Sequence, residues 1–262
     1  MDIGLEDKVA LVAAASKGLG KAAAFALARE GAKVVICSRS ELVEKTAEEI
    51  RRETASEVLS IRADLTKSAD IERLVRGALD HFGGIDILII NSGGPPPGSF
   101  FELTPADWRS AIDLTLMSAV QLCYEVVPAM LEVGSGSIVT TQSITVKQPI
   151  DNLTLSNSLR LAVIGLMKSL ANELGPKGIR VNSINPTWTW TERVQKLLED
   201  RAKRNGTTIE EEATKVANEI PLGRMGTVEE FGRTIAWLAS PAASFINGHA
   251  LMFDGGAAQV PL

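Results

Sequence analysis

The chain of 262 residues has few of the residue types that build disulfide frameworks, metal sites and nucleic-acid surfaces. Its two cysteines, Cys37 and Cys123, lie far apart, which predicts neither a disulfide framework nor a metal centre. The two histidines, His81 and His249, stand outside any cluster with the spacing of metal ligands. The net charge is −5 and there is no basic stripe, so we expect no nucleic-acid partner.

The sequence also shows no long hydrophobic run and no pattern typical of an N-terminal targeting signal. No apolar run approaches the ~20 residues of a membrane-spanning helix, and residues 1–8 are acidic and polar, unlike a signal or transit peptide. Hydrophobic residues nevertheless make up 45% of the chain, as in a globular protein with a sizeable core. We therefore expect one domain over 1–262, a reducing cytoplasmic environment and no membrane partner.

Short apolar runs alternate with amphipathic helical patterns along the chain. Most runs are β-branched and apolar on both faces, as in strands that are covered on both sides. They lie at 9–14, 34–37, 58–61, 87–90, 137–141, 181–184 and 250–253. The helical patterns lie at 18–30, 41–54, 68–82, 104–132, 153–175 and 227–239. This alternation predicts an α/β fold with a single Rossmann-type doubly wound parallel sheet of about seven strands.

Residues 187–226 interrupt the alternation. Highly charged helical patterns at 192–203 and 209–220 follow each other with no strand pattern between them. Ligands of open α/β sheets bind beyond the carboxyl ends of the strands. Because this insertion follows the run at 181–184, we expect it to form a helical lid over that crevice; a solvent-exposed helical hairpin is the alternative.

A glycine-containing turn follows the first run and opens a helical pattern. Its residues include Ser16, Lys17, Gly18, Leu19 and Gly20. Glycines let the backbone approach a pyrophosphate, and the N-terminus of a helix offers it unpaired N–H groups. Arg39 follows the second run, where an arginine accommodates the 2′-phosphate of NADP and an acid would bind the ribose of NAD. The pattern favours NADP, with Lys17 as a second positive charge, and leaves NAD as the alternative.

Further motifs support a resemblance to a known family. They are Asp64-Leu65-Thr66, Ile90-Asn91-Ser92-Gly93, the segment from Asn185-Pro186 to Thr191, the segment 221–226 and Asp254-Gly255-Gly256. With the glycine turn, they resemble the short-chain dehydrogenase/reductase family over nearly the whole chain, in particular the β-ketoacyl carrier-protein reductases. The resemblance implies hydride transfer to or from a small carbonyl or alcohol substrate. It also implies that the cofactor is surrounded by Gly18, Leu19, Asp64, Leu65, Asn91, Gly93, Pro186 and Thr191.

The catalytic residues of that family are an asparagine, a serine, a tyrosine and a lysine, and only the serine is kept here. The resemblance places Ser143 at the serine, Thr115 at the asparagine, Ser156 at the tyrosine and Arg160 at the lysine. Ser156 and Arg160 are four residues apart and share a helix face. Tyr124 is the only tyrosine of the chain and lies in a different helical pattern.

The replacements change the proton chemistry that the site offers. A serine is a far weaker acid than a phenol, and an arginine keeps its charge. We therefore expect an NAD(P)-dependent oxidoreductase with a non-standard proton route. A catalytically silent dinucleotide-binding regulatory protein and a non-redox isomerase or hydratase on the same fold are the alternatives. Lys147 is a candidate substitute acid, and an exposed loop lysine is its alternative interpretation.

Two further features concern the surface and the lid. The helical pattern at 153–175 carries small residues at Ala162, Gly165 and Ser169, which allow close helix–helix approach. In the family that the chain resembles, this helix and the preceding one form a two-fold interface, which implies a homodimer or homotetramer. Trp188 and Trp190 lie in the insertion, where they either wall an apolar substrate pocket or attach the lid to the core.

Overall fold

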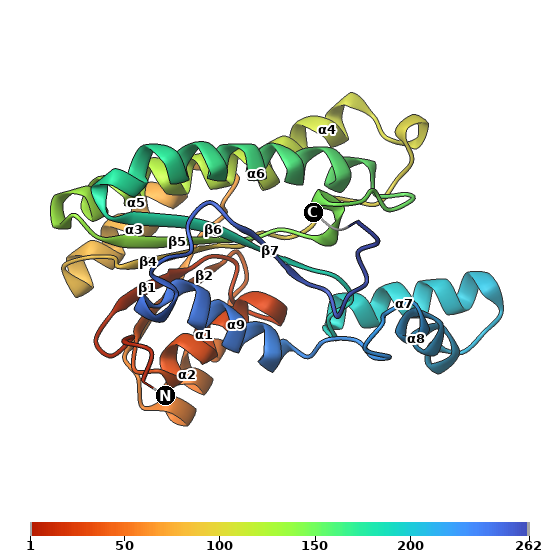
Figure 1. The fold of residues 1–262 in the computed structure, drawn as a ribbon, viewed down its shortest axis with the longest axis horizontal. Helices are drawn as coiled ribbons and strands as arrows, with labels where there is room; N and C mark the ends of the chain where they lie inside the picture. Colours follow the sequence, from red (N-terminus) through yellow and green to blue (C-terminus); the bar gives the residue numbers. More distant parts are fainter. Residues whose placement is uncertain (1, 261–262) are drawn as a thin grey trace.

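Seven parallel strands form one sheet in the computed structural model, which describes residues 2–260 (Figure 1). The strands are β1 Val9–Val12, β2 Lys33–Ser38, β3 Val58–Arg62, β4 Ile87–Ile90, β5 Gly136–Thr141, β6 Ile179–Pro186 and β7 Ala250–Phe253. Their order is β3-β2-β1-β4-β5-β6-β7, so the winding reverses between β1 and β4. All neighbouring pairs are parallel, which confirms the predicted doubly wound α/β fold.

Helices cover both faces of this sheet. The α-helices of the described residues are α1 Gly18–Arg29, α2 Leu42–Thr54, α3 Ser68–Phe82, α4 Pro105–Ile112, α5 Ser118–Val133, α6 Thr154–Leu174, α7 Glu192–Asn205, α8 Ile209–Asn218 and α9 Val228–Ala239. One buried cluster joins α3, α5 and α6 to the sheet, and a second joins α1, α2 and α9 to its other face. In Figure 1 the first group lies above the strands and the second group below them.

The side chains of β1 show how one strand serves two cores. Leu11 is fully buried in the cluster with α3, α5 and α6, whereas Ala10 and Val12 are fully buried in the other cluster. Successive side chains of a strand point to opposite faces of the sheet. A strand that is covered on both faces therefore needs an apolar residue at every position, which is the physical origin of the short continuous apolar runs.

Two predicted elements differ from the structure near the carboxyl end of the sheet. The run predicted at 9–14 ends as a strand at Val12, because Ala14 has a φ of 49° and the chain turns there. The helical pattern predicted at 104–132 divides into α4, a π-helical turn over Asp113–Met117, and α5. A π-helical turn has more residues than an α-turn, so it shifts the face that the following side chains present.

The helical stretch Pro105–Val133 is long and apolar enough to cross a membrane by length and composition alone. The expectation that no apolar run approaches this length is therefore wrong for this stretch. Core helices of globular proteins pass the same test, and α5 buries Leu122, Val126 and Met130 against the sheet. The apolar character of α5 is explained by this packing.

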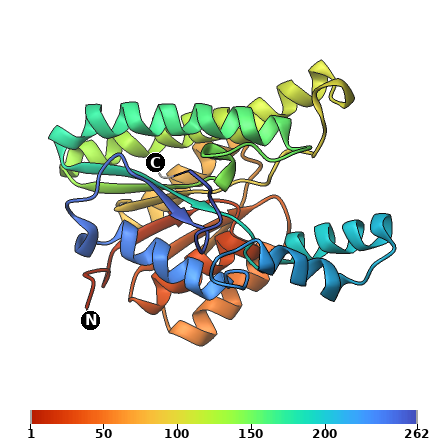
Figure 2. The ribbon, with the colours of Figure 1, turned by 45° about the vertical axis from the view of Figure 1, so that its right-hand side comes forward.

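Residues 187–226 form a helical hairpin of α7 and α8 beyond the carboxyl end of β6. Figures 1 and 2 show the hairpin extending away from the two helical layers. Helix α7 continues past the predicted end at 203 to Asn205, and Gly206 ends it with a φ of 66°. Helix α8 ends at Asn218 instead of 220. The hairpin encloses its own small core around Leu198 and Val216.

Candidate functional site

A cleft of about 1260 Å³ opens at the carboxyl ends of the strands, where the winding of the sheet reverses. Its walls come from the turn after β1, the loops after β2 to β6, the start of α6 and the inner side of α7. The predicted site residues that line it are Ser16, Lys17, Gly18, Leu19, Arg39, Asp64, Leu65, Asn91, Gly93, Ser143, Ser156, Arg160, Pro186 and Thr191. Gly20 and Thr115 lie outside the lining, so the cleft brings together all but two of the predicted residues.

Gly20 lies behind the glycine turn and allows its close packing. A Cβ atom on Gly20 would lie 2.5 Å from the carbonyl oxygen of Ala14 and 2.8 Å from Nδ2 of Asn91. That amide nitrogen donates hydrogen bonds to the carbonyl oxygens of Ala13 and Ala14, at 3.3 Å and 3.2 Å. The structure thus shows a packing role for Gly20, whose α-carbon faces the backbone of the turn. Its predicted contact with the cofactor stays a prediction.

The N-terminus of α1 is open towards the cleft. Lys17 at its N-cap position makes no side-chain capping bond, and the first turn contains no acidic residue. Its free N–H groups and the positive end of the helix dipole favour an anion at Gly18 and Leu19. The Lys17 ammonium lies 3.4 Å from Oε2 of Glu192 at the start of α7, in an exposed pair that connects the turn to the hairpin.

The end of β2 presents Arg39 to the cleft. A short turn fixes the backbone on both sides of Arg39, because the Ser38 hydroxyl donates to the Ser40 carbonyl at 2.9 Å and accepts from the Ser40 N–H at 3.1 Å. The Arg39 side chain is exposed and takes part in none of the ion pairs of residues 2–260. An unpaired guanidinium at this position is suited to a phosphate.

Asp64 and Leu65 follow β3 at the same edge of the cleft. Oδ1 of Asp64 accepts hydrogen bonds from the N–H and the hydroxyl of Thr66, at 3.1 Å and 2.8 Å. The Asp64 N–H donates to Asp70 at 2.8 Å, and this bond, followed by the contact with Arg73, lowers the pKa of Asp70. The loop is thus tied to α3, which holds the buried Leu65 in place at the wall of the cleft.

Three of the four predicted catalytic positions line the cleft. Ser143 follows β5, and its Oγ accepts a hydrogen bond from the N–H of Thr145 at 3.3 Å. Ser156 and Arg160 approach from the first turns of α6. Thr115 lies buried in the π-helical turn, next to Leu114, which lines the cleft. Its Oγ1 has no hydrogen-bond partner among the described residues.

Arg160 extends along the cleft towards the end of β5. Its Nη1 lies 3.4 Å from both the carbonyl oxygen of Thr141 and Oε1 of Gln142, so each contact is long. Gln142 is itself held by a bond from its Nε2 to the Thr140 hydroxyl at 2.6 Å. Desolvation, and then the charge of Arg193, lower the pKa of Arg160 to about 10. The side chain remains a cation at neutral pH.

Arg193 is a cleft residue that the sequence analysis missed. It lies in the first turn of α7, and its guanidinium packs against the backbone of Gly94 so closely that a Cβ atom on Gly94 would collide with it. Partial desolvation there lowers its pKa. No local spacing relates Arg193 to Arg160, and the glycine pair at positions 93 and 94 was the only sign of a close approach to the loop after β4.

The structure also places Lys147 and the two tryptophans of the insertion. Lys147 is half-buried after the short turn that follows Ser143, and it is not among the residues that line the cleft. Trp188 packs with the small core of the hairpin and stacks 4.7 Å from the guanidinium of Arg201, and it also lines the cleft. Trp190 is 46% exposed and is not a cleft residue. Of the two tryptophans, only Trp188 contributes both to the core of the hairpin and to the wall of the cleft.

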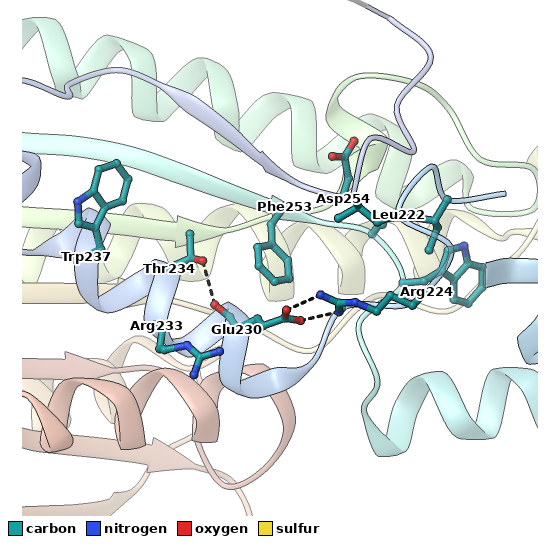
Figure 3. A pocket seen from close by; sticks show the side chains of 13 residues that line it. Leu222, Arg224, Glu230, Arg233, Thr234, Trp237, Phe253 and Asp254 are labelled. Atoms are coloured by element: carbon teal, nitrogen blue, oxygen red, sulfur yellow. Dashed lines mark hydrogen bonds and ion pairs between the residues drawn. The ribbon is translucent and has the colours of Figure 1, made fainter. Parts of the chain in front are cut away.

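A second cavity of about 480 Å³ lies between β7 and α9, away from the predicted site residues (Figure 3). Arg224 and Glu230 face each other across it in a bidentate ion pair of 2.9 Å and 2.6 Å. Glu230 also accepts from the N–H of Thr227 and completes a capping box at the start of α9. The contact with Arg224, followed by that with Thr227, lowers the pKa of Glu230 to about 2. These contacts identify the cavity as a structural junction.

The chain matches a protein-family model described as enoyl-(acyl carrier protein) reductase over residues 13–258. It is 34% identical to dehydrogenase/reductase SDR family member 4 of Sus scrofa, over 97% of this chain and 88% of the relative. It is 31% identical to the 3-oxoacyl-[acyl-carrier-protein] reductase FabG of Vibrio cholerae, over 96% of this chain and 98% of the relative.

Solved structures agree with these matches. The L-sorbose reductase of Gluconobacter frateurii, in complex with NADPH and L-sorbose, superposes with a TM-score of 0.96 and 30% identity over 99% of this chain and 100% of that chain. A variant actinorhodin polyketide ketoreductase with NADPH has a TM-score of 0.92 and 30% identity, over 97% and 98% of the two chains. A dinucleotide-binding oxidoreductase fold is thus defined over nearly the whole chain, which belongs to the short-chain dehydrogenase/reductase family.

Proposed function

We propose that this protein is an NADP-dependent oxidoreductase that interconverts a small carbonyl compound and its alcohol. The observation that carries the proposal is the single cleft that holds the glycine turn, Arg39, Ser143 and Arg160 together. The NADPH complexes of L-sorbose reductase and the ketoreductase, both similar over nearly their whole length, support the choice of cofactor.

The residues of the cleft fit NADP at both of its phosphate groups. The uncapped N-terminus of α1 suits the pyrophosphate, and the exposed Arg39 guanidinium suits the 2′-phosphate. Asp64 and Leu65 are then adenine-side residues, and Asn91, Gly93, Pro186 and Thr191 lie along the path to the reacting end. When bound, the nicotinamide supplies or accepts the hydride.

Ser143 and Arg160 supply the polar groups at the reacting end. The Ser143 hydroxyl donates a hydrogen bond to the carbonyl oxygen of the substrate and to the alkoxide that develops there, and Arg160 adds a positive charge to the same cleft. A serine oxygen at position 156 lies roughly 4 Å nearer the backbone than a phenol oxygen would, on ordinary bond lengths. That space admits a water molecule, which delivers the proton that Arg160 does not release.

The proposal also covers the hairpin beside the cleft, the oligomeric state and the cellular location. The hairpin at 187–226 acts as a lid on one side, since Glu192 and Arg193 line the cleft from the first turn of α7. The exposed side of α6 carries Ala162 and Gly165, which supports a homodimer or homotetramer. A cytoplasmic location remains part of the same proposal.

Dinucleotide binding without turnover is the second candidate function. It is favoured by the residue types of the chain, which has a threonine at position 115, a serine at position 156 and an arginine at position 160. Fold similarity does not decide between the two candidates, because one fold hosts many activities.

Cofactor titration tests the proposal directly. Nicotinamide fluorescence is followed while NADPH or NADH is added to the wild type and to Arg39→Ala. We expect NADPH to bind more tightly than NADH, and Arg39→Ala to weaken NADPH about tenfold or more while NADH changes little, because one charge-assisted contact is lost. No binding of either cofactor at millimolar concentration would overturn the proposal. Binding without reduction of any member of a ketone and sugar panel would favour the silent protein.

A further inference from the structure

Arg160 and Arg193 form a pair of like charges that the hydride-transfer chemistry does not explain. Arg160 reaches the cleft from α6, where its Nη1 lies 3.4 Å from the carbonyl oxygen of Thr141 at the end of β5. Arg193 reaches it from α7, with its guanidinium packed at Gly94 in the loop after the neighbouring strand β4. The charge of Arg193 also lowers the pKa of Arg160. None of the ion pairs among residues 2–260 includes either arginine. Two guanidinium groups that share one cleft without a carboxylate partner repel each other.

The position of Arg193 on its helix is also unfavourable for its positive charge. It belongs to the first turn of α7, where the positive end of the helix dipole disfavours a cation. Its sequence neighbour Glu192 is directed to Lys17, 3.4 Å away. Its guanidinium is instead packed on the backbone of Gly94. Arg193 is exposed, so water screens part of its charge. An anion bound between the two guanidinium groups would offset their remaining repulsion and the unfavourable interaction of Arg193 with the helix dipole.

We propose that Arg160 and Arg193 bind the carboxylate of an acidic substrate beside Ser143, so that the natural substrate is an oxo acid or the corresponding hydroxy acid. A guanidinium offers a planar pair of N–H donors that matches a carboxylate, and two such groups from different helices fix its orientation. This inference deepens the proposed oxidoreductase function and rests on it. The phosphates of NADP have other partners in the cleft, at the start of α1 and at Arg39.

The reaction at such a site is balanced without a further reactant. In the reducing direction, a hydride from NADPH adds to the carbonyl carbon of the oxo acid. The carbonyl oxygen takes one proton, which solvent supplies through a water molecule, so that oxo acid, NADPH and H⁺ give the hydroxy acid and NADP⁺. The carboxylate takes no part in the bond changes; its role is to place the carbonyl oxygen against Ser143.

The test compares acids with uncharged isosteres in three forms of the full chain. The probes are 2-oxobutyrate, acetoacetate and 4-oxopentanoate, each paired with its methyl ester. The proteins are the wild type, Arg193→Gln and the control Lys196→Gln, which removes the same charge from an exposed position of α7 outside the cleft. The readouts are KM and kcat with NADPH, the Kd of NADPH from fluorescence, and the Tm of the cofactor-free protein with each probe.

We expect at least one acid to have a KM about tenfold or more below that of its ester in the wild type, and to raise the Tm when the ester does not. Arg193→Gln removes both differences and leaves the Kd of NADPH unchanged, while Lys196→Gln behaves as the wild type. An equal KM for every acid and ester would overturn the inference. So would a loss of NADPH affinity in Arg193→Gln that equals its loss for the acid, because the pair would then bind the cofactor.

The same measurements separate this inference from the proposed function. If NADPH does not bind, but an acid still raises the Tm of the wild type and not of Arg193→Gln, the oxidoreductase proposal fails and the carboxylate site stands. If NADPH binds and neutral ketones are reduced, but no acid raises the Tm, the carboxylate site fails and the oxidoreductase proposal stands. Arg160→Lys adds a check on geometry, since it keeps the charge and loses the paired donors.

Discussion

Replacing Gly20 by alanine tests whether close packing of the glycine turn requires a glycine at this position. The added Cβ would lie 2.5 Å from the carbonyl oxygen of Ala14 and 2.8 Å from Nδ2 of Asn91. Neither neighbour is the end of a flexible side chain that can move away freely. The carbonyl belongs to the backbone of the turn, and the amide is hydrogen-bonded to that same turn. The variant must therefore displace the turn that lines the cleft.

The magnitude follows from three contributions. Overpacking against backbone costs about 1–3 kcal/mol. Breaking the hydrogen bond from Asn91 to Ala14 costs about 1 kcal/mol more. An alanine in a helix is favoured over a glycine by roughly 1 kcal/mol, which offsets part of this loss. We expect Gly20→Ala to lower the free energy of unfolding by about 1–3 kcal/mol and to weaken NADPH binding by at least tenfold.

Urea unfolding followed by circular dichroism measures the first quantity, and nicotinamide fluorescence measures the second. Gly77→Ala in α3 is the matched control, because a Cβ there meets only the terminal Cδ1 of Ile61, at 2.8 Å, which a small rotation moves away. We expect its free energy of unfolding to stay within about 1 kcal/mol of the wild type. Gly20→Ala with the stability and NADPH affinity of Gly77→Ala would refute the packing argument.

Two further predictions concern titration and catalysis. The pKa of Glu230 is lowered to about 2 from 4.5 by Arg224 and Thr227, so its contribution to stability is complete above pH 4.5 and is lost as the pH falls through this interval towards 2. Thermal unfolding at a series of pH values should show a smaller decrease in Tm over this interval for Glu230→Gln than for the wild type, and parallel curves would contradict this assignment. The double variant Ser156→Tyr with Arg160→Lys restores a phenol and a lysine, and we expect kcat for a neutral ketone to rise roughly 100-fold, the lower end of general acid–base assistance. A wild type that is faster than this variant on its own preferred substrate would show that a dedicated proton route already exists.

Much of the fold was predictable because the strands and helices follow from local periodicity. The continuous apolar runs around Leu11 and Leu88 reflect strands that are buried on both faces, and amphipathic stretches of helical period lie between them. The errors in this part concern element ends. The strand at Val9 is shorter than its apolar run, since the left-handed conformation of Ala14 begins the turn, and no apolar pattern marks that conformation.

The composition of the cleft was only partly predictable. Motif positions placed Ser143, Ser156 and Arg160 correctly along the cleft, since each lies directly after a strand or in the first turns of a helix. Thr115 lies outside the cleft, in a π-helical turn that the uninterrupted helical pattern at 104–132 concealed. Lys147 shows that closeness in sequence does not predict the lining of the cleft, because it is four residues from Ser143 and is not among the lining residues.

By itself, the sequence determined the order of strands and helices, the glycine turn, the arginine after the second strand and the substitutions at positions 156 and 160. These are properties of neighbouring residues, and periodicity and spacing express them directly. Only the tertiary structure placed Gly20 behind the turn and brought Arg193 into the cleft that Arg160 lines. These tertiary placements depend on how the crossovers and the hairpin bring together residues that are distant in the chain. No local sequence pattern predicts that packing.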